Sequence, residues 1–239
     1  MRTQSNLAPT TVPPMSEDQH LDPPTPVQAV LFDFGGVITT SPFEAFNRYE
    51  DSIGVPRDTI RTINSTNPDD NAWAKMERSE VDTAGFAALF EAEAAALGHE
   101  LSGAAVLGCL SGNVRPEMVR ALGLLKERGL RIGCITNNMK AGHGAGMARS
   151  EAAATAVTEA MSHFEVVIES AVEGLRKPDP AIYLLACERM NIQPGDAIYL
   201  DDLGINCKPA KALGMQAIKV TSGEQALADL ERLTGLNLR

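Results

Sequence analysis

Five short apolar runs, separated by longer helical stretches, constrain the fold of this chain more than any other feature. The runs lie at residues 29–32, 130–135, 164–168, 197–200 and 216–220. The first of them is apolar at every position, as expected of a strand that is buried on both faces. Strands that alternate with helices in this way form a parallel sheet covered by helices on both sides. We therefore predict an α/β fold with a doubly wound parallel sheet.

One long helical stretch interrupts this alternation after the first strand. Apolar side chains recur at helical spacing within residues 42–112. We interpret this stretch as a helical cap domain inserted into a core domain that is formed by residues 27–41 and 113–239. Residues 1–26 are rich in Pro, Thr and acidic or amide side chains, and we expect a disordered tail there because too few apolar groups are available for burial.

Polar residues follow the apolar runs at three places. Asp33 follows the first run, Thr136 and Asn137 follow the second, and Asp201 and Asp202 follow the fourth. Ligands bind at the carboxyl ends of the strands in a parallel sheet, so we expect these loops to lie side by side. Asp33 alone would be an ordinary helix N-cap or turn residue. Together the three acids predict a site for Mg²⁺, a hard cation that prefers carboxylate, carbonyl and water ligands.

The residues near this predicted metal site favour a phosphorylated substrate. Mg²⁺ held by a few carboxylates usually acts on a phosphoryl group. Thr136 and Asn137, with their adjacent backbone N–H groups, are suited to donate to phosphate oxygens. Lys177 would be an ordinary surface lysine, except that its loop, fixed by prolines, precedes a crossover helix and can reach the same sheet edge. We expect the partner to be a small phosphorylated compound.

Charge and composition argue against several other partners and compartments. The formal net charge of −10 disfavours nucleic acid, whose phosphate backbone requires a basic face. No apolar run approaches the roughly 20 residues that span a bilayer, and the start of the chain lacks the features of a secretory signal. The four cysteines show no CxxC spacing, which is typical of reduced thiols. We expect a cytoplasmic monomer or homodimer that binds neither nucleic acid nor membrane.

Four segments resemble, in the expected order, the four motifs of the haloacid dehalogenase-like (HAD) hydrolase superfamily. Residues 30–37 resemble motif one, and residues 134–138 resemble motif two. Residues 176–180, Arg-Lys-Pro-Asp-Pro, match motif three, and residues 199–202 match motif four. The likeness covers residues 27–239. It implies a Rossmann-like core, and it identifies the helical insert with the C1-type cap of one phosphatase subfamily.

The resemblance implies how such a chain would transfer a phosphoryl group. Asp33 corresponds to the nucleophile, which forms an aspartyl-phosphate that water then hydrolyses. The residues that would contact the phosphoryl group and stabilise charge on its oxygens are Thr136, Asn137, Gly36 and Lys177. Thr136 and Lys177 count with Asp33 as catalytic residues in this scheme.

The resemblance also implies a set of metal ligands. Mg²⁺ would be held by the Asp33 carboxylate, the backbone carbonyl of Gly35 and Asp202, with Asp201 as a direct or water-mediated ligand. Asn206 would orient the acids from behind. A narrower likeness, to the phosphatase domain at the N-terminus of soluble epoxide hydrolases, is carried by residues 200–215 and by the ending 227–238.

Gly35 departs from the motif of most phosphatases in this superfamily. Those enzymes have a second Asp two residues after the nucleophile, which acts first as general acid and then as base. Gly35 keeps its carbonyl for the metal but has no proton to transfer, and such help is worth about 10²–10⁴-fold in rate. A slow phosphatase, a substrate with a good leaving group, or an acid supplied by the cap would each accommodate the change.

Two other functions fit parts of the same pattern. A 2-haloacid dehalogenase uses the same nucleophile and Lys without a metal, but the pair Asp201 and Asp202 argues against it, because uncompensated acids disfavour an ionised nucleophile. A catalytically weakened binding or regulatory protein would explain Gly35, but it would have no need of Asp33 or Lys177. A Mg²⁺-dependent phosphatase is therefore the principal hypothesis.

The remaining sequence features carry less chemistry. The glycines at 142–146 follow no strand directly, so we interpret them as a flexible loop rather than a dinucleotide site. His143 and His163 have no accompanying Ser or Cys motif, so we assign them no acid–base role. In the cap, we expect Trp73 in the core, with a pocket-facing position of residues 73–78 as the alternative. Lys75 or Arg78 would then be the candidates to meet an anionic part of the substrate.

Overall fold

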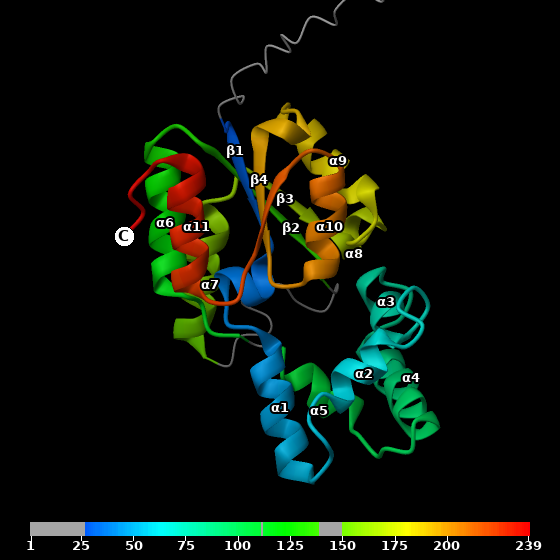
Figure 1. The fold of residues 1–239 in the computed structure, drawn as a ribbon. Helices are drawn as coiled ribbons and strands as arrows, with labels where there is room; N and C mark the ends of the chain where they lie inside the picture. Colours follow the sequence, from blue (N-terminus) through cyan, green and yellow to red (C-terminus); the bar gives the residue numbers. More distant parts are fainter. Residues whose placement is uncertain (1–26, 111, 139–149) are drawn as a thin grey trace, which may run out of the picture.

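The computed structural model describes residues 27–110, 112–138 and 150–239 (Figure 1). Within these ranges, parallel strands form one sheet in the order β3-β2-β1-β4-β5. The strands are β1 (Ala29–Phe32), β2 (Arg131–Thr136), β3 (Val166–Glu169), β4 (Ala197–Asp201) and β5 (Gln216–Lys219). The first strand in the chain is thus the central one, between β2 and β4. The predicted doubly wound α/β fold is confirmed.

The alternation of side chains along β1 builds two hydrophobic layers. All four residues of β1 are fully buried. Val30 and Phe32 join the layer under α6 (Pro116–Glu127), α7 (Glu151–Ser162) and α11 (Gly223–Thr234). Ala29 and Leu31 join the opposite layer, under α9 (Pro180–Met190) and α10 (Gly204–Ala212). Figure 1 shows these helices on the two sides of the sheet. A strand apolar at every position is therefore the one buried on both faces.

The observed strands differ from the predicted apolar runs only at their ends. Two short elements that we did not predict complete the sheet half of the molecule: α8 (Ser170–Glu173) and a turn of helix at Pro194–Asp196. The third strand starts two residues later than the apolar run, because Phe164 still closes the end of α7 through its N–H bond to Met161 O (3.2 Å). The apolar pattern predicts burial, whereas strand ends depend on backbone pairing.

A second group of helices lies beyond the carboxyl ends of the strands (Figure 1). It consists of α1 (Pro42–Ile53), α2 (Thr59–Ser65), α3 (Ala72–Glu77), α4 (Thr83–Ala96) and α5 (Gly103–Gly108), which we call the helical unit. Its buried residues form a hydrophobic cluster of their own, which includes Phe46, Ile60, Met76, Phe86 and Phe90. The division of the chain into cap and core domains remains a prediction.

Two neighbouring segments connect the helical unit to the sheet. Thr39 and Val114 form an antiparallel bridge, and the Thr40 N–H donates to the carbonyl of Asn113 (2.8 Å). A Cβ at Gly112 would lie 2.6 Å from the Thr40 carbonyl oxygen, so only glycine allows the segments to approach this closely. The chain therefore passes between the helical unit and the sheet in two short segments that are hydrogen-bonded to each other.

Two predictions concern segments that the structure does not describe. The tail 1–26 and the glycine-rich loop 142–146 with His143 lie outside the described residues. Across the residues that are described, no helix combines the length and apolar character needed to cross a bilayer.

Candidate active site

The turn after β1 places Asp33 at the edge of the sheet. The Asp33 N–H donates to the Leu200 carbonyl on β4 (2.8 Å), and its Oδ1 accepts from the Phe34 N–H (2.7 Å). The chain then turns tightly through Phe34–Ile38, with Gly36 at a φ of +78°. A Cβ at Gly36 would lie 2.2 Å from Oδ2 of Asp202. Glycine thus permits both the left-handed backbone and the close approach of this turn to Asp202.

Three carboxylates converge where β1 and β4 end. Ligand oxygens of Asp33, Asp201 and Asp202 all lie within 4.8 Å of one another. This arrangement follows from the topology, because β1 and β4 are adjacent and parallel. The sequence expectation that these loops lie side by side agrees with the geometry of the three acids.

Asp201 is fully buried and held by several donors. Its carboxylate accepts from the Leu203 N–H (2.8 Å) and from Nδ2 of Asn206 (3.1 Å to each oxygen). The Tyr199 hydroxyl donates to Oδ2 of the same group. Because several donors contact both of its oxygens, the Asp201 carboxylate is held in one position at the bottom of the site. Asn206, on α10, thus contacts both carboxylate oxygens of Asp201.

Lys177 lies between two of the acids. Its Nζ is 2.9 Å from Oδ1 of Asp33 and 2.8 Å from Oδ2 of Asp201, and its side chain is only 1% exposed. The Asn137 side chain holds the backbone of the same residue, with Oδ1 accepting from the Lys177 N–H (2.8 Å) and Nδ2 donating to its carbonyl (3.1 Å). Asn137 therefore ties the end of β2 to the loop that carries Lys177.

The charges in this site do not balance. Burial raises the pKa of Asp33 to about 8, since the nearby acids add to the effect and Lys177 only partly offsets it. Burial and Asp201 raise the pKa of Asp202 to about 6. Burial alone would lower the pKa of Lys177, but Asp201 and Asp33 raise it above its usual value. Three close carboxylates and one ammonium form an oxygen-rich, anionic donor set that fits a divalent cation.

Ser41 contributes to the site although its position predicts only a helix cap. It precedes Pro42 at the start of α1, where a serine usually caps the helix. Its hydroxyl instead donates to Oδ2 of Asp202 (3.0 Å). The only sequence signal was its nearness to the first motif. Ser41 thus connects the start of the helical unit to one of the three acids.

A cavity of about 790 Å³ opens above the acids, between the sheet and the helical unit. The predicted site residues that line it are Asp33, Gly35, Thr136, Asn137, Lys177, Asp202 and Asn206. Asp201 and Gly36 stand behind this lining, Asp201 beneath Lys177 and Gly36 against Asp202. The helical unit supplies the opposite wall, with the rings of Phe43, Phe46 and Trp73 among the lining.

The two cations that we expected to meet the substrate are engaged elsewhere. Lys75 pairs with Asp70 (3.3 Å) and Arg78 with Glu80 (2.6 Å). Neither Lys75 nor Arg78 is among the described residues that line the cavity, so their contact with a substrate stays a prediction that the geometry does not favour. The arginines that do line the cavity are Arg61 and Arg176. His163, at the end of α7, is not part of the described lining.

Comparison with known proteins places this geometry in a family. The sequence model of a protein family, haloacid dehalogenase-like hydrolase, matches residues 27–214. Acyl-CoA dehydrogenase family member 10 of Mus musculus is 33% identical over 216 residues, which are 88% of this chain and 19% of that protein. Bifunctional epoxide hydrolase 2 of Sus scrofa is 28% identical over 228 residues, or 89% of this chain and 40% of that protein. The chain thus spans less than half the length of either relative.

Two further similarities cover nearly whole proteins. Sesquiterpene phosphatase astK of Aspergillus oryzae is 25% identical over 213 residues, which are 88% of this chain and 98% of that protein. A HAD family enzyme of Bacteroides thetaiotaomicron, solved in complex with magnesium and inorganic phosphate, superimposes with a TM-score of 0.54 at 20% identity, covering 82% of this chain and 96% of the other. These matches confirm the resemblance drawn from the four motifs. The chain belongs to the haloacid dehalogenase-like hydrolase family.

Proposed function

We propose that this protein is a Mg²⁺-dependent phosphatase that hydrolyses a phosphate monoester through an aspartyl-phosphate on Asp33. One observation carries the proposal: the Lys177 ammonium contacts Asp33 and Asp201 while Asp202 completes a cluster of three carboxylates. Such a cluster repels an anionic substrate unless a cation is bound with it. A divalent ion balances the excess negative charge and makes phosphate binding favourable.

The donor set indicates which residues would hold Mg²⁺. Asp33, Asp202 and the Gly35 carbonyl are the direct candidates. Asp201 would act through water, because its two oxygens already accept from Lys177, Leu203 and Asn206. When bound, the ion would neutralise charge on the phosphoryl oxygens. The magnesium and phosphate in the Bacteroides enzyme are consistent with this assignment.

The chain's own residues account for the two chemical steps. Oδ1 of Asp33 accepts from Phe34 and Lys177, so we infer that Oδ2 attacks phosphorus. A bond forms between Oδ2 and phosphorus while the bond to the leaving oxygen breaks, and that oxygen takes a proton from solvent water because Gly35 has none to give. Lys177 offsets the negative charge. Water then attacks the phosphorus of the aspartyl-phosphate, the bond between phosphorus and Oδ2 breaks, and the carboxylate is restored. The attacking water gives one proton to solvent as phosphate is released. The Thr136 hydroxyl, on the cavity wall, would donate to the phosphoryl oxygens in both steps.

The cavity favours a substrate with an apolar body. Its volume lies in the range of roughly 300–1,000 Å³ that is typical of ligand sites. Phe43, Phe46 and Trp73 supply aromatic surface from the helical unit, and the exposed Ile205 supplies an aliphatic edge from the sheet side. A phosphate at the acids with an apolar group against these rings satisfies both halves of the cavity. The name of the Aspergillus relative, a sesquiterpene phosphatase, supports this substrate class.

Hydrolysis of p-nitrophenyl phosphate with Mg²⁺ and with EDTA tests the reaction. We expect turnover only with the metal, and none for Asp33→Asn. Metal-independent halide release from a 2-haloacid would identify a dehalogenase instead. Hydrolysis of no compound in a broad panel of phosphate esters would favour the binding protein. Within that panel, an isoprenoid monophosphate should have a lower KM than a sugar phosphate, and the reverse order would refute the apolar substrate class.

A further inference from the structure

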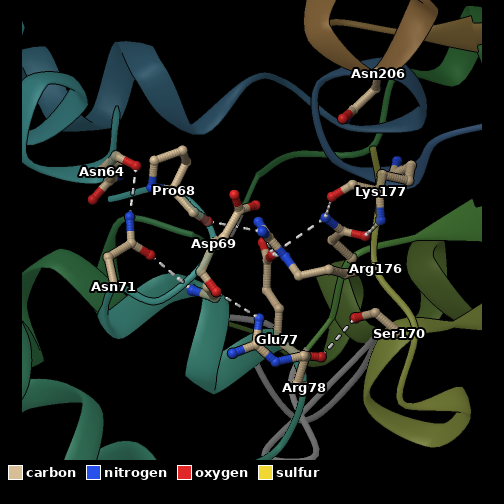
Figure 2. A network of polar contacts seen from close by, with 12 residues as sticks. Asn64, Pro68, Asp69, Asn71, Glu77, Arg78, Ser170, Arg176, Lys177 and Asn206 are labelled. Atoms are coloured by element: carbon tan, nitrogen blue, oxygen red, sulfur yellow. Dashed lines mark hydrogen bonds and ion pairs between the residues drawn. The ribbon is translucent and has the colours of Figure 1, made fainter. Parts of the chain in front are cut away.

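Glu77, the last residue of α3, reaches from the helical unit to the sheet half of the molecule (Figure 2). Its Oε2 accepts from Nε of Arg176 (2.7 Å) and lies 2.6 Å from Nη2 of the same guanidinium. Nδ2 of Asn137 donates to this oxygen as well (3.2 Å). The Glu77 carbonyl accepts from the hydroxyl of Ser170 (2.9 Å). One residue of the helical unit thus contacts three separate segments at the sheet edge.

Arg176 strengthens the same connection from the other side. Its Nη1 donates to the carbonyl of Pro68 (3.0 Å), in the segment that precedes α3 (Figure 2). The side chains of Glu77 and Arg176 are only 17% and 19% exposed. Burial raises the pKa of Glu77, and Arg176 opposes that rise. An ion pair this far from solvent is favourable only when further hydrogen bonds complete it, which Asn137 and Pro68 do here.

The contacts of Glu77 lead directly to the catalytic lysine. Asn137, which donates to Glu77, also holds the backbone of Lys177 by two hydrogen bonds. Arg176 is the residue immediately before Lys177. Glu77 therefore bonds to both groups that fix the Lys177 backbone, and it lines the cavity beside them. Neither the motifs nor the proposed reaction steps assign it a role.

We propose that Glu77 is a positioning residue that holds the helical unit in place through its contacts with Asn137 and Arg176. It sets the fraction of molecules in which the helical unit is closed over the cavity. A ligand that binds only the closed form has an apparent affinity reduced by that fraction, and saturating substrate restores closure. Loss of the Glu77 charge should therefore raise KM and leave kcat nearly unchanged. This kinetic consequence rests on the proposed phosphatase function.

A matched pair of variants tests the proposal. Glu77→Gln removes the negative charge that pairs with Arg176. The control, Glu173→Gln, removes the negative charge from the Glu173–Arg189 ion pair, whose N···O distance is similar (2.7 Å). The Glu173 side chain is 15% exposed, and it is not among the described residues that line the cavity. We expect a roughly tenfold rise in KM for Glu77→Gln with an apolar phosphate ester, which corresponds to about 1.4 kcal/mol, and a change under about twofold for Glu173→Gln. Arg176→Gln should match Glu77→Gln, and the double variant should add little to either.

A second readout does not depend on activity. Trp73 is the single tryptophan of the chain, lies on α3 four residues before Glu77 and lines the cavity. Opening of the helical unit should expose its ring to a neutral quencher. We expect acrylamide to quench Glu77→Gln more strongly than wild type and Glu173→Gln. This difference would support the positioning role even if no phosphatase activity were found.

Three results would overturn the proposal. Equal quenching of Glu77→Gln and Glu173→Gln would show that Glu77 does not hold the helical unit closed. A lower KM in Glu77→Gln would mean that the connection hinders substrate entry. A loss confined to kcat that grows with the pKa of the leaving group would make Glu77 a proton donor, since a positioning residue affects all leaving groups alike.

Discussion

Gly35→Asp is the substitution through which the geometry of the site makes its sharpest kinetic prediction. A Cβ at Gly35 meets no described atom within 4 Å, and the residue has ordinary φ and ψ of −71° and 129°. The new side chain therefore fits without strain, and it would be carried by a residue that lines the cavity. Burial and the three neighbouring acids would raise the pKa of the new carboxyl group, so it would hold a proton near neutral pH.

If Asp33 is the nucleophile, a protonated carboxyl group two residues after it can protonate the leaving oxygen. General acid help is worth about 10²–10⁴-fold, and we expect at least the lower part of that range, a gain of about 10²-fold in kcat for an alkyl phosphate. The gain for p-nitrophenyl phosphate should stay within about threefold, because its leaving group departs without a proton. Steady-state kinetics across a series of leaving groups measures the difference.

Gly35→Asn is the matched control, since it has nearly the same size and no proton to give at neutral pH. It should show no gain on any ester. Equal gains for Gly35→Asp on good and poor leaving groups would refute the reasoning. A loss on both, with Mg²⁺ still bound, would show that Gly35 serves another purpose than leaving room at this position.

Three further predictions follow from the packing and charge of the site. Gly36→Ala, whose Cβ would lie 2.2 Å from Asp202 and whose φ is +78°, should lower the Mg²⁺ affinity at least tenfold by calorimetry, whereas Gly35→Ala should change it less than twofold. Mg²⁺ at about 100 times its Kd should stabilise the protein by about 2.7 kcal/mol in urea unfolding, and Asp202→Asn should lose most of this effect. Lys177→Met leaves two buried acids without their partner, so the metal-free variant should lose about 3–5 kcal/mol of unfolding free energy, measured the same way.

The fold was predictable because its signals are local. The strands that make the sheet are apolar runs, and the parallel order follows from the helices between them. The position of the acids at one sheet edge follows from that order alone. Tyr199 is a contact that the sequence could have revealed. It lies two residues before Asp201 on β4, so their side chains share one face of the strand.

The contacts between the helical unit and the sheet were not predictable in the same way. Glu77 ends a six-residue helix, which is too short to show a clear amphipathic period. Its partner Arg176 is 99 residues away in the sequence, and no local pattern joins the two. By their positions in the sequence, Lys75 and Arg78 were more obvious candidates than Arg176 to meet an anionic group, yet acids close to them in the sequence pair with both. Glu77 and Arg176 meet only because the helical unit packs against the sheet half, and a single sequence does not specify that packing.

The central claim, that Asp33 is a Mg²⁺-dependent nucleophile, is tested most directly by trapping the intermediate. The enzyme is mixed with excess substrate, quenched in acid during turnover and analysed by mass spectrometry of its peptides. We predict one phosphoryl group on the peptide that contains Asp33, present with Mg²⁺, absent with EDTA and absent in Asp33→Asn. Sustained turnover by Asp33→Asn, or a phosphoryl group on any other residue of the wild type, would contradict the account.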